Sequence, residues 1–339
     1  MTDTTILDRL QRPLRDLRIS VTDRCTFRCT YCMPKEVFGR DYAFLSRADL
    51  LSFEEITRLA TIFVKLGVTK IRLTGGEPTL RRDFEKLVEM LASIEGLEDI
   101  AMTTNGSLLT LERAKALKAA GLKRVTVSLD SLNEETFQSM NDVGFPAAKV
   151  LEAIDNATAA GLAPVKVDMV VKRGVNDHDI VDMARHFRGT GHILRFIEYM
   201  DVGTTNGWRK DDMVSAKEIL DALSAEWEIE PVDPNYFGEV AERYRYKDGA
   251  GEVGIIASVT VPFCSACTRA RLSADGELYT CLFGVKGHDL RKLLRDGSSD
   301  DEIESAVRSI WGMRTDRYSE IRSEDTIALE KVEMSRIGG

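Results

Sequence analysis

Short runs rich in β-branched residues alternate with amphipathic helical segments over the first two-thirds of the chain, and this alternation restricts the fold more than any other feature. Strands that are separated by helices are expected to be parallel neighbours joined by right-handed crossovers. The pattern therefore predicts an α/β fold, either a barrel that closes fully or in part or an open doubly wound sheet. The six predicted strands are Leu17–Val21, Thr69–Thr74, Ile100–Thr104, Arg124–Leu129, Val165–Val171 and Ile193–Glu198.

Helix signals lie between these strands. Ser52 and Glu55 form a capping box, and Gly67 ends the helix that they begin. The pattern changes near residue 205, so we expect a barrel region at 1–205 and a C-terminal region at 206–339, which includes an irregular stretch around Pro231 and Pro234. The other predicted helices are Asp83–Ala92, Leu111–Ala120, Pro146–Ala160, Asp179–Phe187, Ala216–Trp227, Leu290–Leu294 and Asp301–Trp311, and a hairpin is predicted from Arg269–Leu272 to Glu277–Thr280.

Unusual residues follow most of the predicted barrel strands. The carboxyl ends of parallel strands meet at one edge of a sheet, where such folds gather their chemistry. A three-cysteine loop follows the first strand directly, so it is expected at that edge. These residues therefore predict one shared site, and the other segments that reach it are Gly75-Gly76-Glu77-Pro78, Asn105-Gly106, Asp130 and Tyr199-Met200-Asp201.

All six cysteines fall into two groups of three at opposite ends of the chain. Three thiolates are one short of the four that close a tetrahedral zinc site or saturate a four-iron cluster. Soft thiolate ligands favour iron–sulfur or zinc, so two metal centres are expected, each with one open position. For the first group the alternatives are buried structural cysteines or zinc completed by a histidine, and for the second group the alternative is half of a zinc ribbon. The groups are Cys25, Cys29 and Cys32, spaced C-x3-C-x2-C, and Cys264, Cys267 and Cys281, spaced C-x2-C-x13-C.

The charge and hydropathy of the chain exclude several classes of partner. There are 46 basic and 55 acidic residues, a net charge of −9, which argues against nucleic-acid or anionic-membrane partners. We find no apolar run of about eighteen residues, and Met1–Arg12 lacks the apolar stretch of a secretory signal. A cytoplasmic location is therefore expected, and in that reducing compartment clustered cysteines bind metals or act in catalysis.

The first cysteine group, with Tyr31 before its last cysteine, resembles the signature of the radical S-adenosylmethionine superfamily. The resemblance implies that the three thiolates hold a [4Fe-4S] cluster whose fourth iron binds S-adenosylmethionine. One electron would cleave this cofactor to a 5′-deoxyadenosyl radical, which abstracts hydrogen from the substrate. The Gly-Gly-Glu-Pro turn resembles the second hallmark of the superfamily: Gly76 would let the backbone approach the methionine part, and Glu77 could hold its ammonium group.

The second cysteine group continues into Arg269 and Arg271, whose side chains share one face of a predicted strand. Alone they could be a solvated face, but beside an open cluster two guanidinium groups are suited to hold an anion. This C-x2-C-x-R-x-R run, the third cysteine after thirteen intervening residues and the terminal Gly338-Gly339 resemble the GTP 3′,8-cyclase family of molybdenum cofactor biosynthesis. The likeness covers nearly the whole chain.

This second resemblance implies a partial (β/α)6 barrel with a C-terminal extension that carries a second [4Fe-4S] cluster, to which GTP binds through its guanine. The activity would be that of a lyase: the radical takes the ribose 3′ hydrogen, and the carbon radical attacks C8 of guanine to give 3′,8-cyclo-7,8-dihydroguanosine triphosphate. Arg269, Arg271 and the Gly338-Gly339 tail are the implied catalytic residues. The residues that match S-adenosylmethionine contacts are Tyr31, Gly76, Ser128 and Met200, and those that match GTP contacts are Arg18, Arg72, Thr103 (or its neighbour Thr104), Lys166, Arg269, Ala270 and Arg271.

The same resemblance implies further partners: a flavodoxin- or ferredoxin-like electron donor, a second copy in a homodimer, and a downstream cyclic pyranopterin monophosphate synthase. Two other functions compete with this interpretation. A radical enzyme that modifies a peptide or another small molecule would usually carry more than three C-terminal cysteines. A non-catalytic iron–sulfur electron carrier would need four cysteine ligands per cluster and no clustered arginines.

Overall fold

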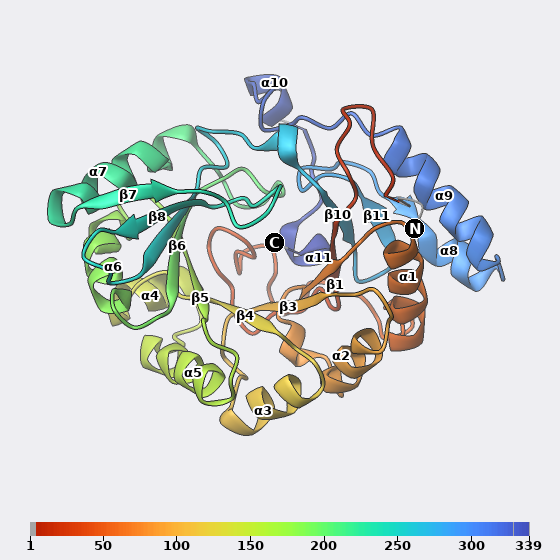
Figure 1. Cartoon of the computed structure of the whole chain (residues 1–339), viewed down its shortest axis with the longest axis horizontal. Helices are drawn as coiled ribbons and strands as arrows, with labels where there is room; N and C mark the ends of the chain where they lie inside the picture. Colours follow the sequence, from red (N-terminus) through yellow and green to blue (C-terminus); the bar gives the residue numbers. More distant parts are fainter. Residues whose placement is uncertain (1–4, 328, 339) are drawn as a thin grey trace.

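The computed structural model describes residues 5–327 and 329–338, and in this part of the chain twelve strands form one sheet. The six predicted strands are confirmed: they follow one another in chain order and all pair in parallel. The sheet curves around a central space and its helices lie outside, so it is a partial barrel and not an open doubly wound sheet (Figure 1). The strands are β1 (Asp16–Ser20), β2 (Lys70–Thr74), β3 (Asp99–Thr104), β4 (Arg124–Ser128), β5 (Lys166–Val171) and β6 (Ile193–Glu198).

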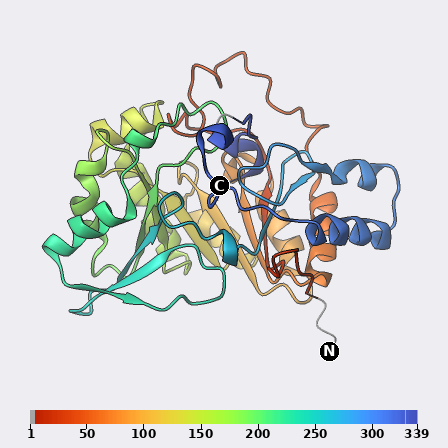
Figure 2. The same ribbon diagram turned by 90° about the horizontal axis from the view of Figure 1, so that it is seen from above.

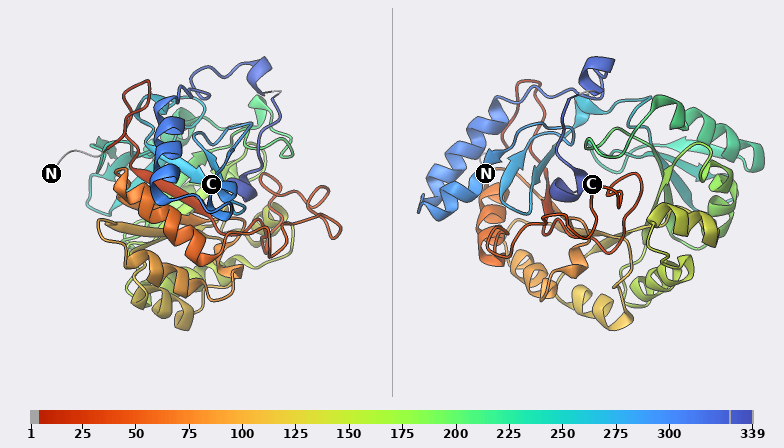
Figure 3. Two further views of the ribbon diagram at one scale, coloured as in Figure 1. Left: turned by 90° about the vertical axis from the view of Figure 1, so that its right-hand side faces the viewer. Right: turned by 180° about the vertical axis from the view of Figure 1, so that it is seen from behind.

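The predicted helices of the barrel region are present on its outer side (Figures 1 and 3). Ser52 Oγ accepts from the Glu55 N–H at 3.1 Å, and the Glu55 carboxylate accepts from the Ser52 N–H at 2.7 Å, so the capping box is confirmed. The eight-residue α4, which Asn133 caps, is not predicted by the sequence pattern because it is too short for a helical period to stand out. The helices are α1 (Phe53–Lys65), α2 (Phe84–Ala92), α3 (Leu111–Ala119), α4 (Glu134–Asn141), α5 (Ala147–Ala159) and α6 (Ile180–Phe187).

The C-terminal region extends the sheet beyond β6. After α7 (Ala216–Glu226), β9 (Glu252–Ile256) pairs in parallel with β6 and antiparallel with β8 (Glu242–Tyr246), and β7 (Ile229–Val232) forms the outer edge. The sequence predicts an irregular stretch here because of its prolines. In the structure Pro231 lies in the edge strand β7, where a missing N–H is tolerated.

The C-terminal region also extends the sheet at its opposite edge. There β10 (Arg269–Leu272) pairs in parallel with β1, and the predicted hairpin to β11 (Glu277–Tyr279) is confirmed. One sheet thus runs through both parts of the chain, and the division at residue 205 stays a prediction. The remaining elements are β12 (His288–Asp289), α8 (Leu290–Arg295) and α9 (Asp300–Gly312) near α1, α10 (Glu324–Ile327) and α11 (Met334–Ile337).

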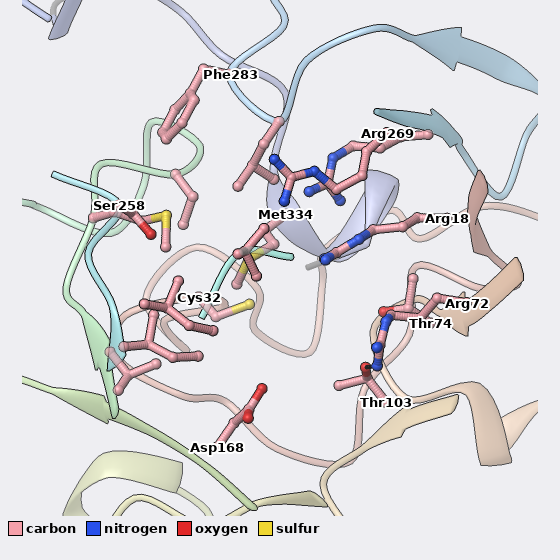
Figure 4. Close-up of a pocket in the computed structure, with 18 of the residues that line it drawn as sticks. Arg18, Cys32, Arg72, Thr74, Thr103, Asp168, Ser258, Arg269, Phe283 and Met334 are labelled. Carbon is pink, nitrogen blue, oxygen red and sulfur yellow. Dashed lines mark hydrogen bonds between the residues drawn. The ribbon is translucent and has the colours of Figure 1, made fainter. Parts of the chain in front are cut away.

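Side chains along the barrel strands alternate between an apolar outer face and a polar inner face. Leu17, Ile71 and Val167 are fully buried in the core between the sheet and the helices. Their neighbours Arg18 and Arg72 point to the interior of the barrel (Figure 4), where the helix α11, dark blue in Figure 2, also lies. Cations on these strands therefore line part of the barrel interior. Across the residues that the structure describes, no helix is long and apolar enough to cross a membrane.

Candidate active site

A cavity of about 310 Å³ occupies the barrel interior, and all six cysteines line it. The two groups, which we call the first cysteine triad (25, 29, 32) and the second cysteine triad (264, 267, 281), meet there although they lie at opposite ends of the chain. Figure 4 shows Arg18 and Arg269 projecting from one wall, with Cys32 across the cavity. The convergence predicted from the loops after the strands is thus present in the structure.

The first cysteine triad lies in the loop after β1, where the backbone wraps around its sulfur atoms. The Phe27 N–H lies 3.4 Å from Cys25 Sγ, and Asn105 Nδ2 approaches the same sulfur at 3.5 Å. Burial raises the pKa of Cys25 to about 11 and also raises the pKa values of Cys29 and Cys32. Iron binds the thiolate form, so loading this site would release protons.

The arrangement of the triads differs from that of a single-ion site. Within residues 5–327 and 329–338, no three His, Cys, Asp or Glu side chains are arranged to hold one metal ion. A four-iron cluster holds each thiolate on a different iron, so its ligands lie further apart than those of a zinc ion. Three cysteines on the wall of one cavity fit such a cluster.

The Gly-Gly-Glu-Pro turn packs against the segment that leads into the first triad. The Gly76 N–H donates to the Thr22 carbonyl at 2.8 Å, and a Cβ on Gly76 would overlap the Arg24 backbone. Glu77 does not line the cavity. It is fully buried, and its carboxylate accepts from the Asn105 N–H at 2.7 Å and from three donors on Thr79 and Thr104.

Glu77 therefore ties the turn after β2 to the end of β3. Three of these hydrogen bonds go to Oε1 and one to Oε2, and direct contact of Glu77 with the ammonium group of S-adenosylmethionine stays a prediction. Gly76 itself lines the cavity, so the backbone of the turn remains available there. Burial is the main cause of a raised pKa at Glu77, and the four donors oppose it.

The other residues that match S-adenosylmethionine contacts come together beside the first triad. Tyr31, Ser128 and Met200 all line the cavity. The Tyr31 hydroxyl donates to Asp130 Oδ2 at 2.7 Å, and the Val170 N–H donates to Asp130 Oδ1 at 2.9 Å. Burial raises the pKa of Asp130 to about 6, although these hydrogen bonds oppose the rise. The aspartate thus fixes the ring of Tyr31 on the cavity wall.

The wall opposite the first triad carries a group of arginines. Because β10 pairs with β1 in a register that sets Arg271 opposite Arg18, these side chains and Arg269 share the inner face. Burial and the charges of Arg271 and Arg72 hold the pKa of Arg18 well below the usual arginine value. Burial and Arg269 likewise lower the pKa of Arg271 to about 10. The positive charges of these arginines repel one another, so the wall strongly attracts an anion.

The hydrogen bonds of Thr103 and Thr104, the last two residues of β3, show which of them lies beside the cations. Arg72 Nη1 donates to Thr103 Oγ1 at 3.0 Å, whereas Thr104 Oγ1 donates to Glu77 at 2.8 Å. Thr103 is therefore the threonine that lies with the cations. Ala270 is buried in the outer apolar layer, so only its backbone, opposite Leu17 in the β-ladder, faces neighbouring strands.

Lys166 differs from the other predicted cations, because it does not line the cavity. Burial, followed by the charges of Arg195 and Arg124, lowers its pKa to about 8. Four cations that the sequence analysis missed do line the cavity: the two strand residues Lys70 and Arg195, and also Arg12 and Arg314. Lys70 lies two residues before Arg72 on the same face of β2, and Arg195 is paired with Asp168 at 2.7 Å. Period-two spacing along the strands is the signal that could have identified Lys70 and Arg195.

The second cysteine triad is assembled by the β10–β11 hairpin, as predicted. Cys264 and Cys267 precede β10, and Cys281 follows β11. Burial would raise the pKa of Cys267, but the charges of Arg269 and Arg314 lower it to about 6. Burial and the charge of Asp316 instead raise the pKa of Cys281 to about 11. The thiols of this triad therefore differ in acidity.

The C-terminal tail reaches the same wall. Met334, the first residue of α11, lines the cavity, and Ile337 at the end of that helix is fully buried. The Gly338 carbonyl accepts a hydrogen bond from Arg271 Nη1. Gly339 lies outside the described residues. The predicted tail is thus brought to the arginine wall as far as Gly338.

The sequence matches two family models in succession. The Radical SAM superfamily model matches residues 19–187, and the Molybdenum Cofactor Synthesis C model matches residues 192–320. The chain is 56% identical over 95% of its length to a GTP 3′,8-cyclase of Acidothermus cellulolyticus, of which it covers 90%. It is 50% identical over 98% of its length to a GTP 3′,8-cyclase of Staphylococcus carnosus, of which it covers 99%.

Among solved structures, the fold is similar to that of SuiB from Streptococcus suis bound to S-adenosylmethionine. The TM-score is 0.61 at 14% identity, and the alignment covers 94% of this chain and 73% of SuiB. This likeness concerns the fold alone.

Proposed function

Because this chain belongs to the GTP 3′,8-cyclase family of radical S-adenosylmethionine enzymes, we propose that its two cysteine triads and the cations between them act together on GTP. Family membership assigns it an iron–sulfur cluster, S-adenosylmethionine and a place in molybdenum cofactor biosynthesis. The observation that carries the proposal is the single cavity shared by both triads and the arginine wall.

The first cysteine triad would hold the cluster that binds S-adenosylmethionine. When bound, the cluster and S-adenosylmethionine supply the radical that abstracts the ribose 3′ hydrogen of GTP. The chain contributes the backbone of Gly76, the ring of Tyr31, and the side chains of Ser128 and Met200 around that position. Asp130 keeps Tyr31 in place, and the surrounding burial excludes water from the reacting atoms.

The second cysteine triad would hold a second [4Fe-4S] cluster, with its open position directed at the guanine of GTP. Arg18, Arg269 and Arg271 lie on the inner faces of adjacent strands, where forked guanidinium groups suit phosphate oxygens. Lys70 and Arg195 extend this charge along the same cavity. The Gly338-Gly339 tail would help to position the substrate beside Arg271.

The remaining partners are proposed from the family alone. They are a flavodoxin- or ferredoxin-like electron donor, a second copy of this chain in a homodimer, and a cyclic pyranopterin monophosphate synthase that takes the product. The cation-lined interior of a chain with net charge −9 supports a polyanionic small molecule as the substrate.

The test is an anaerobic assay of the reconstituted chain with reductant, S-adenosylmethionine and GTP. We expect roughly eight irons per chain and GTP-dependent formation of 5′-deoxyadenosine. Arg269→Ala and Arg271→Ala should weaken GTP binding with iron content unchanged, whereas Arg243→Ala, an arginine of β8 outside the cavity, should leave both unchanged. Formation of 5′-deoxyadenosine that does not depend on GTP, without consumption of GTP, would contradict the proposal.

A further inference from the structure

Arg314 lies just beyond α9 and holds the loop of the second cysteine triad through a buried guanidinium. Nη1 donates to the backbone carbonyl of Cys267 at 2.8 Å, and Nη2 donates to Sγ of the same residue at 3.1 Å. The side chain is almost completely buried, and its guanidinium lies 4.5 Å from the centre of the Trp311 ring. The two hydrogen bonds to Cys267 and the contact with the Trp311 ring thus fix the position of the guanidinium.

A second buried arginine holds the other end of the same loop. Arg12 Nη1 donates to the Cys264 carbonyl and to the Asp316 carbonyl, both at 2.8 Å. Asp8 joins the two arginines, because its Oδ2 lies 2.6 Å from Arg12 Nε and 3.3 Å from Arg314 Nη1. Through Asp8, the N-terminal segment therefore holds both arginines in place.

The charges in this group are balanced by Asp8 and Asp316, whose Oδ2 lies 3.4 Å from Arg314 Nε. Burying such ions is costly, so their geometry must be supported by hydrogen bonds. Cys267 is the cysteine of the second triad that, among the described residues, receives guanidinium hydrogen bonds at sulfur. Arg314 reaches this sulfur from the segment after α9, and both Arg314 and Arg269 line the cavity.

We propose that Arg314 is a positioning residue that makes the second cluster easier to reduce by donating a hydrogen bond to the Cys267 thiolate. The proposal rests on the second cluster proposed above. Reduction adds one electron from the external donor, and no bond forms or breaks. A reduced cluster carries one more negative charge on iron and its thiolates, so a buried N–H donor stabilises it more than the oxidised form. The reduction potential is therefore expected to be more positive with Arg314 than without it.

The experiment isolates the second cluster in the Cys25→Ala/Cys29→Ala/Cys32→Ala variant of the full chain. In this background, Arg314→Met removes both the charge and the donors, and Arg314→Lys keeps the charge but cannot reach the carbonyl and the sulfur together. Arg243→Met is the matched control. Arg243 lies in β8, outside the cavity that the cysteines line, and it likewise bonds a carboxylate (Glu252) and a backbone carbonyl (Asp233). The readouts are iron content and a potentiometric titration followed by electron paramagnetic resonance.

We expect about four irons per chain in all four proteins. The potential should move to more negative values in Arg314→Met and less far in Arg314→Lys, and it should not move in Arg243→Met. An unchanged potential in Arg314→Met overturns the proposal. Loss of iron from both Arg314 variants, with iron retained in the control, also overturns it and assigns Arg314 to folding of the loop. A background variant that binds no iron instead refutes the second cluster itself.

Discussion

The guanidinium of Arg271 donates a hydrogen bond to the backbone carbonyl of Gly338, which joins an inner-face residue of β10 to the C-terminal end of the chain. Gly338 has a φ of +72°, and a Cβ at this position would overlap the side chain of Thr74 at the end of β2. The tail therefore fits between two strands of the barrel only because residue 338 is glycine.

Gly338→Ala should displace the tail and lower GTP turnover by roughly 10- to 100-fold, the scale of loss that misplaced active-site groups cause. Iron content should be unchanged, because no cysteine ligand is touched. Gly312→Ala is the control, since its added Cβ meets no atom within 4 Å. Turnover and 5′-deoxyadenosine formation are measured for both. A Gly338→Ala enzyme with the full rate would show that the tail is not needed in this position.

GTP affinity should decrease as the pH rises through about 8, because burial and the charges of Arg195 and Arg124 lower the pKa of Lys166 to about 8. A phosphate group binds the ammonium form of Lys166, and above its pKa that form is lost. The lowered pKa also means that the free energy of unfolding rises from about pH 8 toward the ordinary lysine pKa, where the unfolded chain binds more protons.

Titration calorimetry of GTP at about pH 7 and pH 9 measures this dependence. Lys166→Arg should bind equally at both values, and Lys166→Gln should bind weakly at both. If the wild-type protein shows no change between the two pH values, or Lys166→Arg keeps the change, Lys166 does not contact the substrate.

The barrel strands and the cysteine spacing could be predicted from the sequence because both are local patterns. The strands β8 and β9 could not, because β9 pairs with the distant β6 and β8 pairs with β9, after a stretch broken by Pro231. Lys70 and Arg195 were missed for a related reason. The period of two along a strand shows which charged residues share a face, but only the folded barrel shows that this face is the interior.

Glu77 shows what the sequence does not reveal about a residue beside a glycine turn. Its carboxylate accepts hydrogen bonds from Thr104 at the end of β3 and from Asn105 directly after it. Lys166 stays a predicted substrate contact from its match to the family although it does not line the cavity, and the pH dependence of GTP affinity tests it. Contacts between loops depend on the folded barrel, which local patterns do not encode.

Tyr31→Phe should destabilise the folded chain by about 1–3 kcal/mol at neutral pH, because Asp130 loses a buried hydrogen-bond donor. Asp130 has a pKa raised to about 6, so its contribution to stability is present in acid and is lost as the pH rises through 6. The penalty of Tyr31→Phe should therefore be smaller at about pH 5, where Asp130 is protonated. Urea denaturation at both pH values tests this, with the more exposed Tyr42→Phe as the control. An equal penalty at both values would contradict it.

Glu77→Gln should lower the free energy of unfolding by about 1–3 kcal/mol, because the amide turns an N–H₂ group toward donors that need an acceptor. Glu36→Gln, on an exposed loop, is the matched control and should have little effect. Denaturation and S-adenosylmethionine binding are measured together. Weaker S-adenosylmethionine binding without any loss of stability would contradict the structural role and support the predicted direct contact.

The pairing of β10 with β1 sets an order of events during synthesis. The Thr268 hydroxyl bonds the Asp16 carboxylate across 252 positions of sequence, so β1 is an unpaired edge until most of the chain has left the ribosome. Contacts of such long sequence separation form late, whereas the β–α–β units of the barrel can fold as they emerge. The loop of the first triad is therefore complete early in the life of the nascent chain. The arginine wall and the second triad exist only after the final fifth of the protein has been made and has docked.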